Sequence, residues 1–400
     1  MIFLRQILAI GSSIMPLYAH GLEVPEHYHP VRPNGMGGAY TAVANDENAV
    51  WTNPAGISRI RKARSRKTSN LVKFPNAIAG GNKSLYTTYK ADSAEGASAI
   101  SGASAEDNPF WVVAGAFPMF MFNVGRQVAA VTGAYSHTTM EAVVDSENTE
   151  QANTEIISDA GGVLGMALTN KSNRFSLGVQ ARSIGRYAYE GTLPVTTLTD
   201  QDLLESEFKE GSNQSAAVGV DIGAIWTLAD FWFPTIGISV LNVPTGCKKD
   251  YLNPFSKTRE TVCGTVFSGN FANPDAVSTV DPTDIRFGIS MTPRLSRKIA
   301  LRIAAGVHHY HVTSGENNYG LSSIPILKTI HGGVELFVGN PLTPSPFSIT
   351  TGYSQGFATW GVSTRLSFLS LDFASFGRDI STTSTPKEDR RYLGGVSFDF

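Results

Sequence analysis

The chain has 400 residues and a formal net charge of −2, and charged residues make up 16% of it, against about 25% in ordinary soluble proteins. The mean hydropathy is −0.06, and after the first twenty residues no apolar run approaches the roughly 20 residues that cross a bilayer as a helix. A helical membrane protein is therefore excluded, and the absence of a basic face interleaved with aromatics gives no indication of nucleic-acid binding. Strands that are apolar on one face and polar on the other average to this neutral hydropathy.

The first residues have the features of an export signal. Arg5 supplies a short basic region, residues 7–17 an apolar stretch, and Leu17-Tyr18-Ala19 a small-residue cleavage site. We therefore expect residues 1–19 to be a signal peptide that is absent from the mature chain. A buried first helix of a cytosolic domain is the alternative.

Residues 20–68 are expected to form a plug followed by a basic linker. Gly35, Gly37 and Gly38 permit tight turns or close backbone approach, and the Asn53-Pro54 pair restricts Asn53 to extended conformations. These features predict a compact segment of small residues that fits inside a barrel lumen. A dinucleotide-binding loop is the rival interpretation of the glycines, but no strand precedes them and the G-x-G-x-x-G spacing is not met.

Residues 59–67 carry six positive charges between the plug and the first expected strand. Such a cluster favours attraction to anionic lipid headgroups, at about 1 kcal/mol per charge near the surface. A solvated linker explains the same charges equally well, and the sequence leaves both interpretations open.

From residue 69 to the end, apolar and polar residues alternate with the period of two that is typical of strands. About fourteen such segments follow one another, near 69–79, 110–121, 126–141, 151–169, 174–190, 213–229, 232–243, 283–292, 298–310, 325–338, 346–355, 357–368, 369–376 and 389–400. Connections after odd-numbered segments are mostly long and those after even-numbered segments short, with a tight turn at 355–357 as the exception. This pattern predicts an all-β antiparallel transmembrane barrel over 69–400, with long extracellular loops, short periplasmic turns and both termini periplasmic.

Two cysteines, Cys247 and Cys263, lie in one long connection. In an exported protein an even, local pair predicts a disulfide, although two free thiols are the alternative. Two cysteines are too few for a structural zinc site, and we expect no metal and no cofactor.

Histidines occur near the end of the strand expected at 298–310, where alternation points His308 inward and His309 outward. They do not converge as metal ligands, so a cluster at the rim is the preferred interpretation. His331 and Glu335 share a lumen face, which suits either an acid/base pair or ordinary polar lining. No arrangement of nucleophile, base and orienting group can be distinguished, and we do not expect an enzyme.

Phe400 ends the chain, behind aromatic or apolar residues at alternate positions. The last strand of a closed barrel must pair with the first, and a terminal aromatic in this pattern resembles the signal read by the outer-membrane assembly machinery. An ordinary edge strand that happens to end in Phe is the alternative.

The run Gly35-Met36-Gly37-Gly38-Ala39, followed by Asp46 and by Asn53-Pro54-Ala55-Gly56, resembles the N-terminal hatch of the long-chain fatty acid transporter superfamily (OMPP1/FadL/TodX). It also resembles the related barrels typified by the type IX secretion protein PorV. Four C-terminal stretches are similar to this second branch: 332–335, 351–356, 371–374 and 389–392. The resemblance covers both ends of the chain, and only the barrel pattern matches in between.

The resemblance implies a barrel of about 14 strands plugged by a hatch. In the transporter branch the hatch shifts when a hydrophobic ligand binds, and the ligand leaves sideways through the wall into the bilayer. A gating role is thereby implied for Asn53, Pro54 and Ala55. We expect the hatch glycines Gly35, Gly37 and Gly38 to contribute as well, because small residues lose few contacts when the segment shifts. We expect a channel for hydrophobic small molecules such as fatty acids, in contact with outer-membrane lipid. The alternative is a barrel without transport activity that anchors or hands over secreted proteins, as in the PorV-like branch.

Overall fold

The computed structural model describes residues 28–63, 71–83, 109–124, 127–144, 148, 150–252, 259–270, 280–310, 312–313, 326–339, 345–366, 368–380 and 387–400. The expected signal peptide lies outside these residues, as do 64–67 of the basic run. The described helical segments are α2 (Val31–Gly35), α3 (Ala49–Thr52), the 3-10 turn η1 (Pro54–Gly56), α4 (Ile57–Ala63), α7 (Val195–Thr199), α8 (Gln201–Gly211) and α9 (Ile326–Thr329). Among them, none is both long and apolar enough to cross a membrane.

Most of the described chain is strand. The wall strands are β1 (Leu71–Asn82), β2 (Phe110–Ala116), β3 (Met119–Asn123), β4 (Val128–Val144), β5 (Gln151–Thr169), β6 (Phe175–Pro194), β7 (Asn213–Thr227), β8 (Thr235–Leu241), β13 (Asp284–Met291), β14 (Ile299–Tyr310), β16 (Ile330–Val338), β17 (Phe347–Ser354), β18 (Phe357–Leu366), β19 (Leu369–Asp379) and β20 (Glu388–Asp399). Shorter strands lie in the connections: β9 (Gly246–Leu252), β10 (Arg259–Val266), β11 (Ser268–Asn270), β12 (Val280–Pro282) and β15 (Val312–Thr313).

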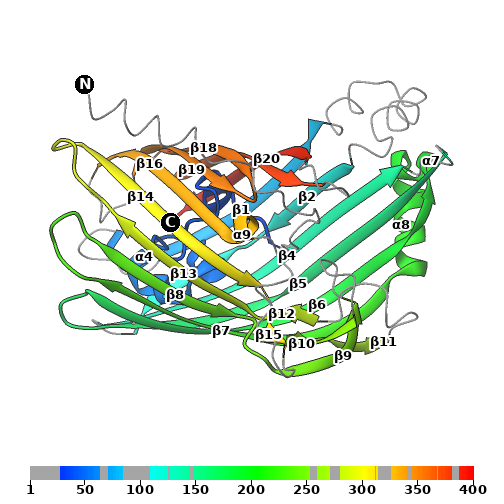
Figure 1. Cartoon of the computed structure of the whole chain (residues 1–400), viewed down its shortest axis with the longest axis horizontal. Coiled ribbons are helices and arrows are strands. Elements are labelled where there is room, and N and C mark those ends of the chain that lie inside the picture. The colour runs from blue at the N-terminus through cyan, green and yellow to red at the C-terminus, as the bar shows by residue number, and fades with distance from the viewer. Residues whose placement is uncertain are drawn as a thin grey trace.

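In the described part of the chain, fourteen antiparallel wall strands close into a barrel, with β2 and β3 together making one of them (Figure 1). Each wall strand pairs with the next along the chain, and β20 pairs with β1 to close the ring. The expected all-β barrel and its strand number are therefore confirmed. Each of the fourteen expected segments overlaps its wall strand, and β16 starts later than expected because α9 occupies residues 326–329.

The second wall strand is interrupted, which the alternation pattern did not predict. Pro118 cannot donate to a strand ladder, so β2 ends before it and β3 begins after it. At this break Phe117 is fully buried, and its backbone N–H donates to the carbonyl oxygen of Asn76 at 3.1 Å. Asn76 itself sits in a register shift of β1 against β20, between Phe74 and Ala77.

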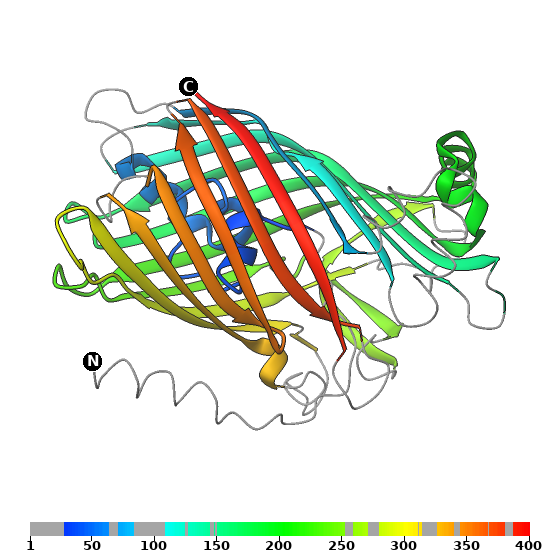
Figure 2. The same cartoon turned by 90° about the horizontal axis from the view of Figure 1, so that it is seen from above.

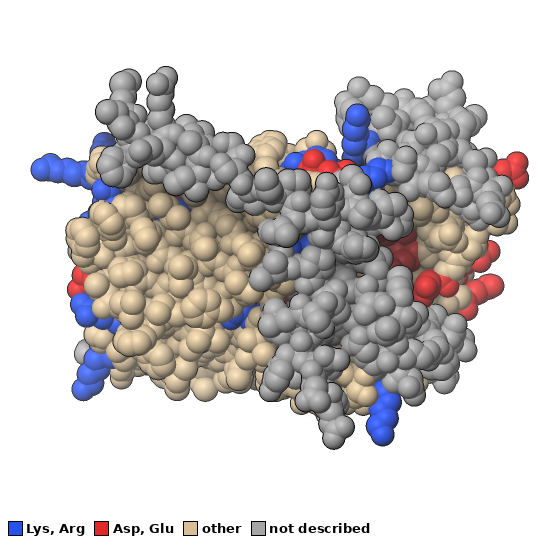
Figure 3. All heavy atoms as spheres, viewed as in Figure 1, with Lys and Arg blue, Asp and Glu red and all other residues tan. Residues whose placement is uncertain are grey.

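The outer face of the barrel is apolar. Phe287 and Trp360 are 46% and 47% exposed, whereas Arg302, on a lumen-facing position, is 6% exposed. In the view of Figure 3 a broad surface without charged side chains covers the region of β8, β13 and β14, and acidic side chains gather at the opposite end near α7 and α8. The alternation in the sequence therefore assigned the two faces correctly, with apolar side chains outward and polar ones toward the lumen.

Residues 31–63, which we call the hatch, lie inside the barrel (Figure 2). They are closer to the end at which short turns join the wall strands, because α4 packs on β4, β5 and β6 near the 170–174 turn. At the opposite end, α7 and α8 follow β6, and β9, β10, β12 and β15 form a small separate sheet. The tight turn expected near 355–357 is present, with positive φ values at Gln355 and Gly356.

Candidate functional site

The hatch meets the wall through the side chain of Asn53, which is completely buried. Asn53 has extended backbone geometry, with φ −161° and ψ 105°, and its Oδ1 accepts from the N–H of Ala55 at 3.1 Å, which caps η1. Its Nδ2 donates to the carbonyl oxygens of Thr41 (2.9 Å) within the hatch, and of Ala224 (3.3 Å) and Ile238 (3.2 Å) on β7 and β8. One amide therefore links two hatch segments to two wall strands.

The wall receives the hatch with glycines that face the lumen. A Cβ atom on Gly178 would overlap with the backbone of Pro54, and one on Gly333 would overlap with the carbonyl oxygen of Met36. Other wall glycines also lie close to the hatch. An added Cβ would come within about van der Waals contact of a hatch atom at Gly165, Gly178, Gly223, Gly237, Gly288, Gly333, Gly352, Gly361 and Gly395. Any side chain at the closest of these positions would push the hatch away from the wall.

Two hatch glycines have backbone geometry that other residues rarely adopt. Gly37 and Gly38 have φ values of +63° and +78°, in the left-handed region where a Cβ is unfavourable. Gly35 instead belongs to α2 and lies against Gly361 of β18, since a Cβ on Gly35 would be 3.2 Å from the Cα of Gly361. The segment after Gly38 forms successive turns and leads into α3.

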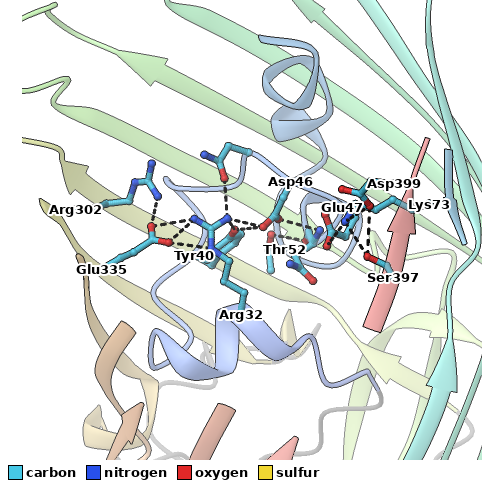
Figure 4. A network of polar contacts seen from close by, with 12 residues as sticks. Arg32, Tyr40, Asp46, Glu47, Thr52, Lys73, Arg302, Glu335, Ser397 and Asp399 are labelled. Atoms are coloured by element: carbon cyan, nitrogen blue, oxygen red, sulfur yellow. Dashed lines mark hydrogen bonds and ion pairs between the residues drawn. The ribbon is translucent and has the colours of Figure 1, made fainter. Parts of the chain in front are cut away.

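A buried ion network ties the centre of the hatch to β14 and β16 (Figure 4). The guanidinium of Arg32 donates to both carboxylate oxygens of Glu335 at 2.7 and 2.9 Å, and to Asp46 at 2.6 Å. Tyr40 also donates to Asp46 at 2.7 Å, and Arg302 of β14 pairs with Glu335 from the wall side. Burial opposes the charge of Asp46, but Arg32 and the Tyr40 hydroxyl outweigh it, so the pKa of Asp46 lies below its usual value.

A second ion network lies at the seam where the barrel closes. Lys73 of β1 is 3.1 Å from Glu47 of the hatch and 3.1 Å from Asp399 of β20. The Lys73 ammonium also donates to the hydroxyl of Ser397 at 3.3 Å. Figure 4 shows that these groups continue the row of polar contacts that starts at Arg302. The hatch is thus held by charges on opposite sides of the lumen.

Aromatic rings surround the hatch residue Trp51. Its ring stacks on Tyr28 at 3.9 Å between centroids and meets Phe117 and Tyr135 edge-on, each at 5.3 Å. The guanidinium of Arg182 lies over the same ring, 5.7 Å from its centroid. Phe117 lies at the break between β2 and β3 and points inward, where it contacts Trp51. The hatch therefore packs against the wall at this break.

His308 and His331 form a stacked pair, with ring centroids 3.9 Å apart. His331 Nδ1 lies 2.8 Å from the carbonyl oxygen of Gly37, and both rings are buried. The expected rim position is therefore wrong for His308, which lies against the hatch. Glu335 pairs with Arg32 and Arg302. Among the described residues, it makes no hydrogen bond with His331. The polar lining of the lumen accounts for both residues.

The other residues singled out in the sequence lie apart from the hatch. Cys247 and Cys263 are joined in a disulfide that links β9 to β10 in the small sheet at the far end of the barrel. Phe400 follows β20, where its backbone exchanges hydrogen bonds of 2.9 and 3.0 Å with Val72, and its side chain is exposed. Arg59 of the basic run points into the barrel and donates to Thr227 at 2.8 Å, so it is not part of a solvated linker.

The wall glycines and the partners of Arg32 were not predicted from the sequence. A signal for the glycines was present, because each occupies a lumen position at which a polar side chain was expected. No local sequence pattern predicts the bond from Arg32 to Glu335, because 303 residues separate them. Among the described residues, no three His, Cys, Asp or Glu side chains gather as metal ligands.

No known family model matches the sequence, and no curated protein matches it significantly. Among solved structures, the toluene transporter TodX of P. putida is similar over 94% of this chain and 98% of its own, with 10% identity and a TM-score of 0.50. The toluene transporter TbuX of Ralstonia pickettii is 13% identical over 94% and 98%, with a TM-score of 0.51. A TodX variant described as a monoaromatic hydrocarbon channel reaches 0.53 at 10% identity, over 93% and 98%. The chain therefore shares the fold of TodX and TbuX, a barrel that the sequence resemblance had implied.

Proposed function

We propose that this protein is an outer-membrane channel for hydrophobic small molecules and that the hatch is its gate. The observation that carries the proposal is the hatch itself, which lies inside the lumen and packs against lumen-facing glycines on several sides of the wall. A route through the barrel then requires the hatch to rearrange. The proposal is supported by the shared fold with TodX and TbuX, which are described as transporters of toluene.

The contacts of the hatch suit a segment with two packings. Small residues lose few contacts when they shift, so alternative arrangements differ by only a few kcal/mol, as a bistable element requires. Polar contacts also join the hatch to the wall, through Asn53, Arg32 and Lys73 and through side chains of β6, β8 and β18 that bond to hatch carbonyl oxygens. Rearrangement of the hatch must exchange these bonds. A hydrophobic ligand that competes for the ring of Trp51 would displace Phe117 and Tyr135 from it and thereby loosen α3.

The arrangement of the loops supports an orientation in the membrane. The hatch lies toward the short turns, and the longer connections with α8 and the small sheet lie at the opposite end. Outer-membrane barrels have short periplasmic turns and longer extracellular loops. We therefore place the hatch and both termini on the periplasmic side, the outer apolar face in lipid, and Phe400 where the assembly machinery can read it.

A second candidate, the handover or anchoring of secreted proteins, is favoured by the ordered far end. There the disulfide fixes β9 to β10, and α8 projects the acidic side chains Glu205, Glu207 and Glu210. Neither candidate function is enzymatic.

Removal of residues 21–57 tests the gate. The barrel should still insert, because its ladder of strands closes without the hatch, and reconstituted vesicles should then admit small solutes and a fluorescent fatty acid that the intact protein excludes or passes slowly. Pro54→Ala should act more weakly, because it frees the backbone without emptying the lumen. Equal conductance and equal uptake by the intact and deleted forms would contradict the gate and favour the handover function.

A further inference from the structure

A cavity of about 260 Å³ lies between the hatch and the wall at the short-turn end of the barrel. Arg59 of α4, Arg174 of the turn before β6 and Arg302 of β14 line it. Five serines or threonines and two asparagines also line it, whereas its apolar lining consists of Ala42, Val43 and Phe233. The cavity therefore carries three guanidinium groups but only one carboxylate, that of Asp230, among neutral polar and apolar side chains.

The positive charge in this cavity is incompletely neutralised. Arg174 is paired with Asp230 at 2.5 Å. Arg302 shares the carboxylate of Glu335 with Arg32. Arg59 has no carboxylate partner among the described residues, and its terminal nitrogen donates to the hydroxyl of Thr227 at 2.8 Å.

The geometry of Arg59 shows an unused donor. Its Nε is buried and has no acceptor in the described part of the protein. Burial lowers the pKa of Arg59, and the positive charge of Arg302 lowers it further, because both disfavour the charged guanidinium. A buried guanidinium whose Nε has no acceptor is costly, and the planar fork of this group matches the oxygens of a phosphate or carboxylate.

We propose that this cavity is a binding site for a small phosphate-class oxyanion, held between Arg59 of the hatch and Arg302 of the wall. Its oxygens accept from the guanidinium group of Arg59, which lines the cavity, and the surrounding hydroxyls and amides supply neutral donors. The same chemistry is offered by a free phosphate and by the phosphomonoester head of a lipid. Ala42, Val43 and Phe233 offer apolar contact to the first part of an acyl chain, so the experiment below separates the two sources.

The site joins a hatch helix to the barrel wall, which gives the anion an effect on the gate. A ligand that binds only the docked hatch stabilises that state in proportion to its occupancy. Raising the anion concentration therefore holds the hatch closed. Anion binding is measured on the closed protein, so this test does not require transport activity.

The test is a calorimetric titration of inorganic phosphate into the full-length protein in a neutral detergent, at constant ionic strength maintained with chloride. Wild type should bind saturably, and Arg59→Gln should weaken binding roughly tenfold or more, since a charged hydrogen bond is lost. Arg59→Lys, which keeps the charge, should lie between them. Lys171→Gln is the matched control, because this exposed cation lies in the same turn as Arg174 but does not line the cavity. It should change the affinity for phosphate by less than about twofold.

A second arm uses dihexanoyl phosphatidic acid and separates the two sources of the anion. Competition between the short-chain lipid and phosphate supports a site for either source, and binding of the lipid alone assigns the site to a headgroup. Hydrogen exchange in residues 57–63 should slow with phosphate in wild type and not in Arg59→Gln. Absence of saturable binding in both arms, or equal affinity in wild type and Arg59→Gln, overturns the proposal.

Discussion

Gly333 of β16 gives the sharpest test of how the hatch is held, because its neighbour Gly332 is a matched control in the same strand. A Cβ on Gly333 would overlap with the carbonyl oxygen of Met36 and lie 3.1 Å from the carbonyl carbon, whereas a Cβ on Gly332 meets nothing within 4 Å. In Gly333→Ala, Met36 must retreat by about 1 Å to restore ordinary contact. Overpacking of this kind costs about 1–3 kcal/mol.

This cost falls on the docked hatch and leaves the barrel paired, since β16 keeps its ladder with β14 and β17. A shift of about 1–3 kcal/mol changes the ratio of docked to released hatch by about 5- to 150-fold. Hydrogen exchange in residues 31–63, followed by mass spectrometry, should speed up by that factor in Gly333→Ala and stay unchanged in Gly332→Ala. Both variants gain the same strand propensity from the added methyl, so that effect cancels. Equal protection of the hatch in the two variants would refute the view that wall glycines seat it.

Three further predictions concern single groups. Glu335→Gln leaves the buried Arg302 without its carboxylate and Arg32 with Asp46 alone, so hatch exchange should accelerate by the equivalent of about 3–5 kcal/mol. Glu205→Gln, in the exposed pair on α8, should have no such effect, and equal behaviour would count against the network. Thiol labelling of unreduced, denatured protein should find neither Cys247 nor Cys263 free, and reduction should loosen the small sheet by about 3 kcal/mol; two labelled thiols would contradict this. Phe400→Asp should slow insertion and leave periplasmic aggregate, and unchanged amounts of heat-modifiable barrel would show that the side chain is not read.

The barrel was predictable because its signal is local. Most wall strands place apolar residues toward lipid and polar residues toward the lumen, so a period of two in the sequence indicates both the strand and its face. The second wall strand differs, because its inward side chains, such as Trp111 and Met121, are apolar and buried. The disulfide was predictable for the same reason, because Cys247 and Cys263 are 16 residues apart. The break at Pro118 was missed because residues 110–122 are apolar on both sides of it, so the sequence pattern does not change at the proline.

The seating of the hatch was not predictable from local pattern. A position along a strand becomes a depth in the lumen only when the tilt and register of all strands are known. His308 illustrates this, since alternation gave its inward direction but its place against His331 and the hatch depends on the pairing of β14 with β16. The Arg32–Glu335 contact depends on the same register.

The salt bridges of Lys73 connect the seam of the barrel with the hatch. Lys73 lies on the first strand, Asp399 on the last, and Glu47 shortly before the first strand in sequence. Until the last strand is made, Lys73 and Glu47 have only each other, and the arrival of Asp399 supplies the carboxylate that completes the cluster. Closure of the barrel and docking of the hatch therefore both use the ammonium group of Lys73. We expect a newly made barrel to close around a hatch that is already in place. Such a barrel would not pass through an open pore that leaks across the membrane.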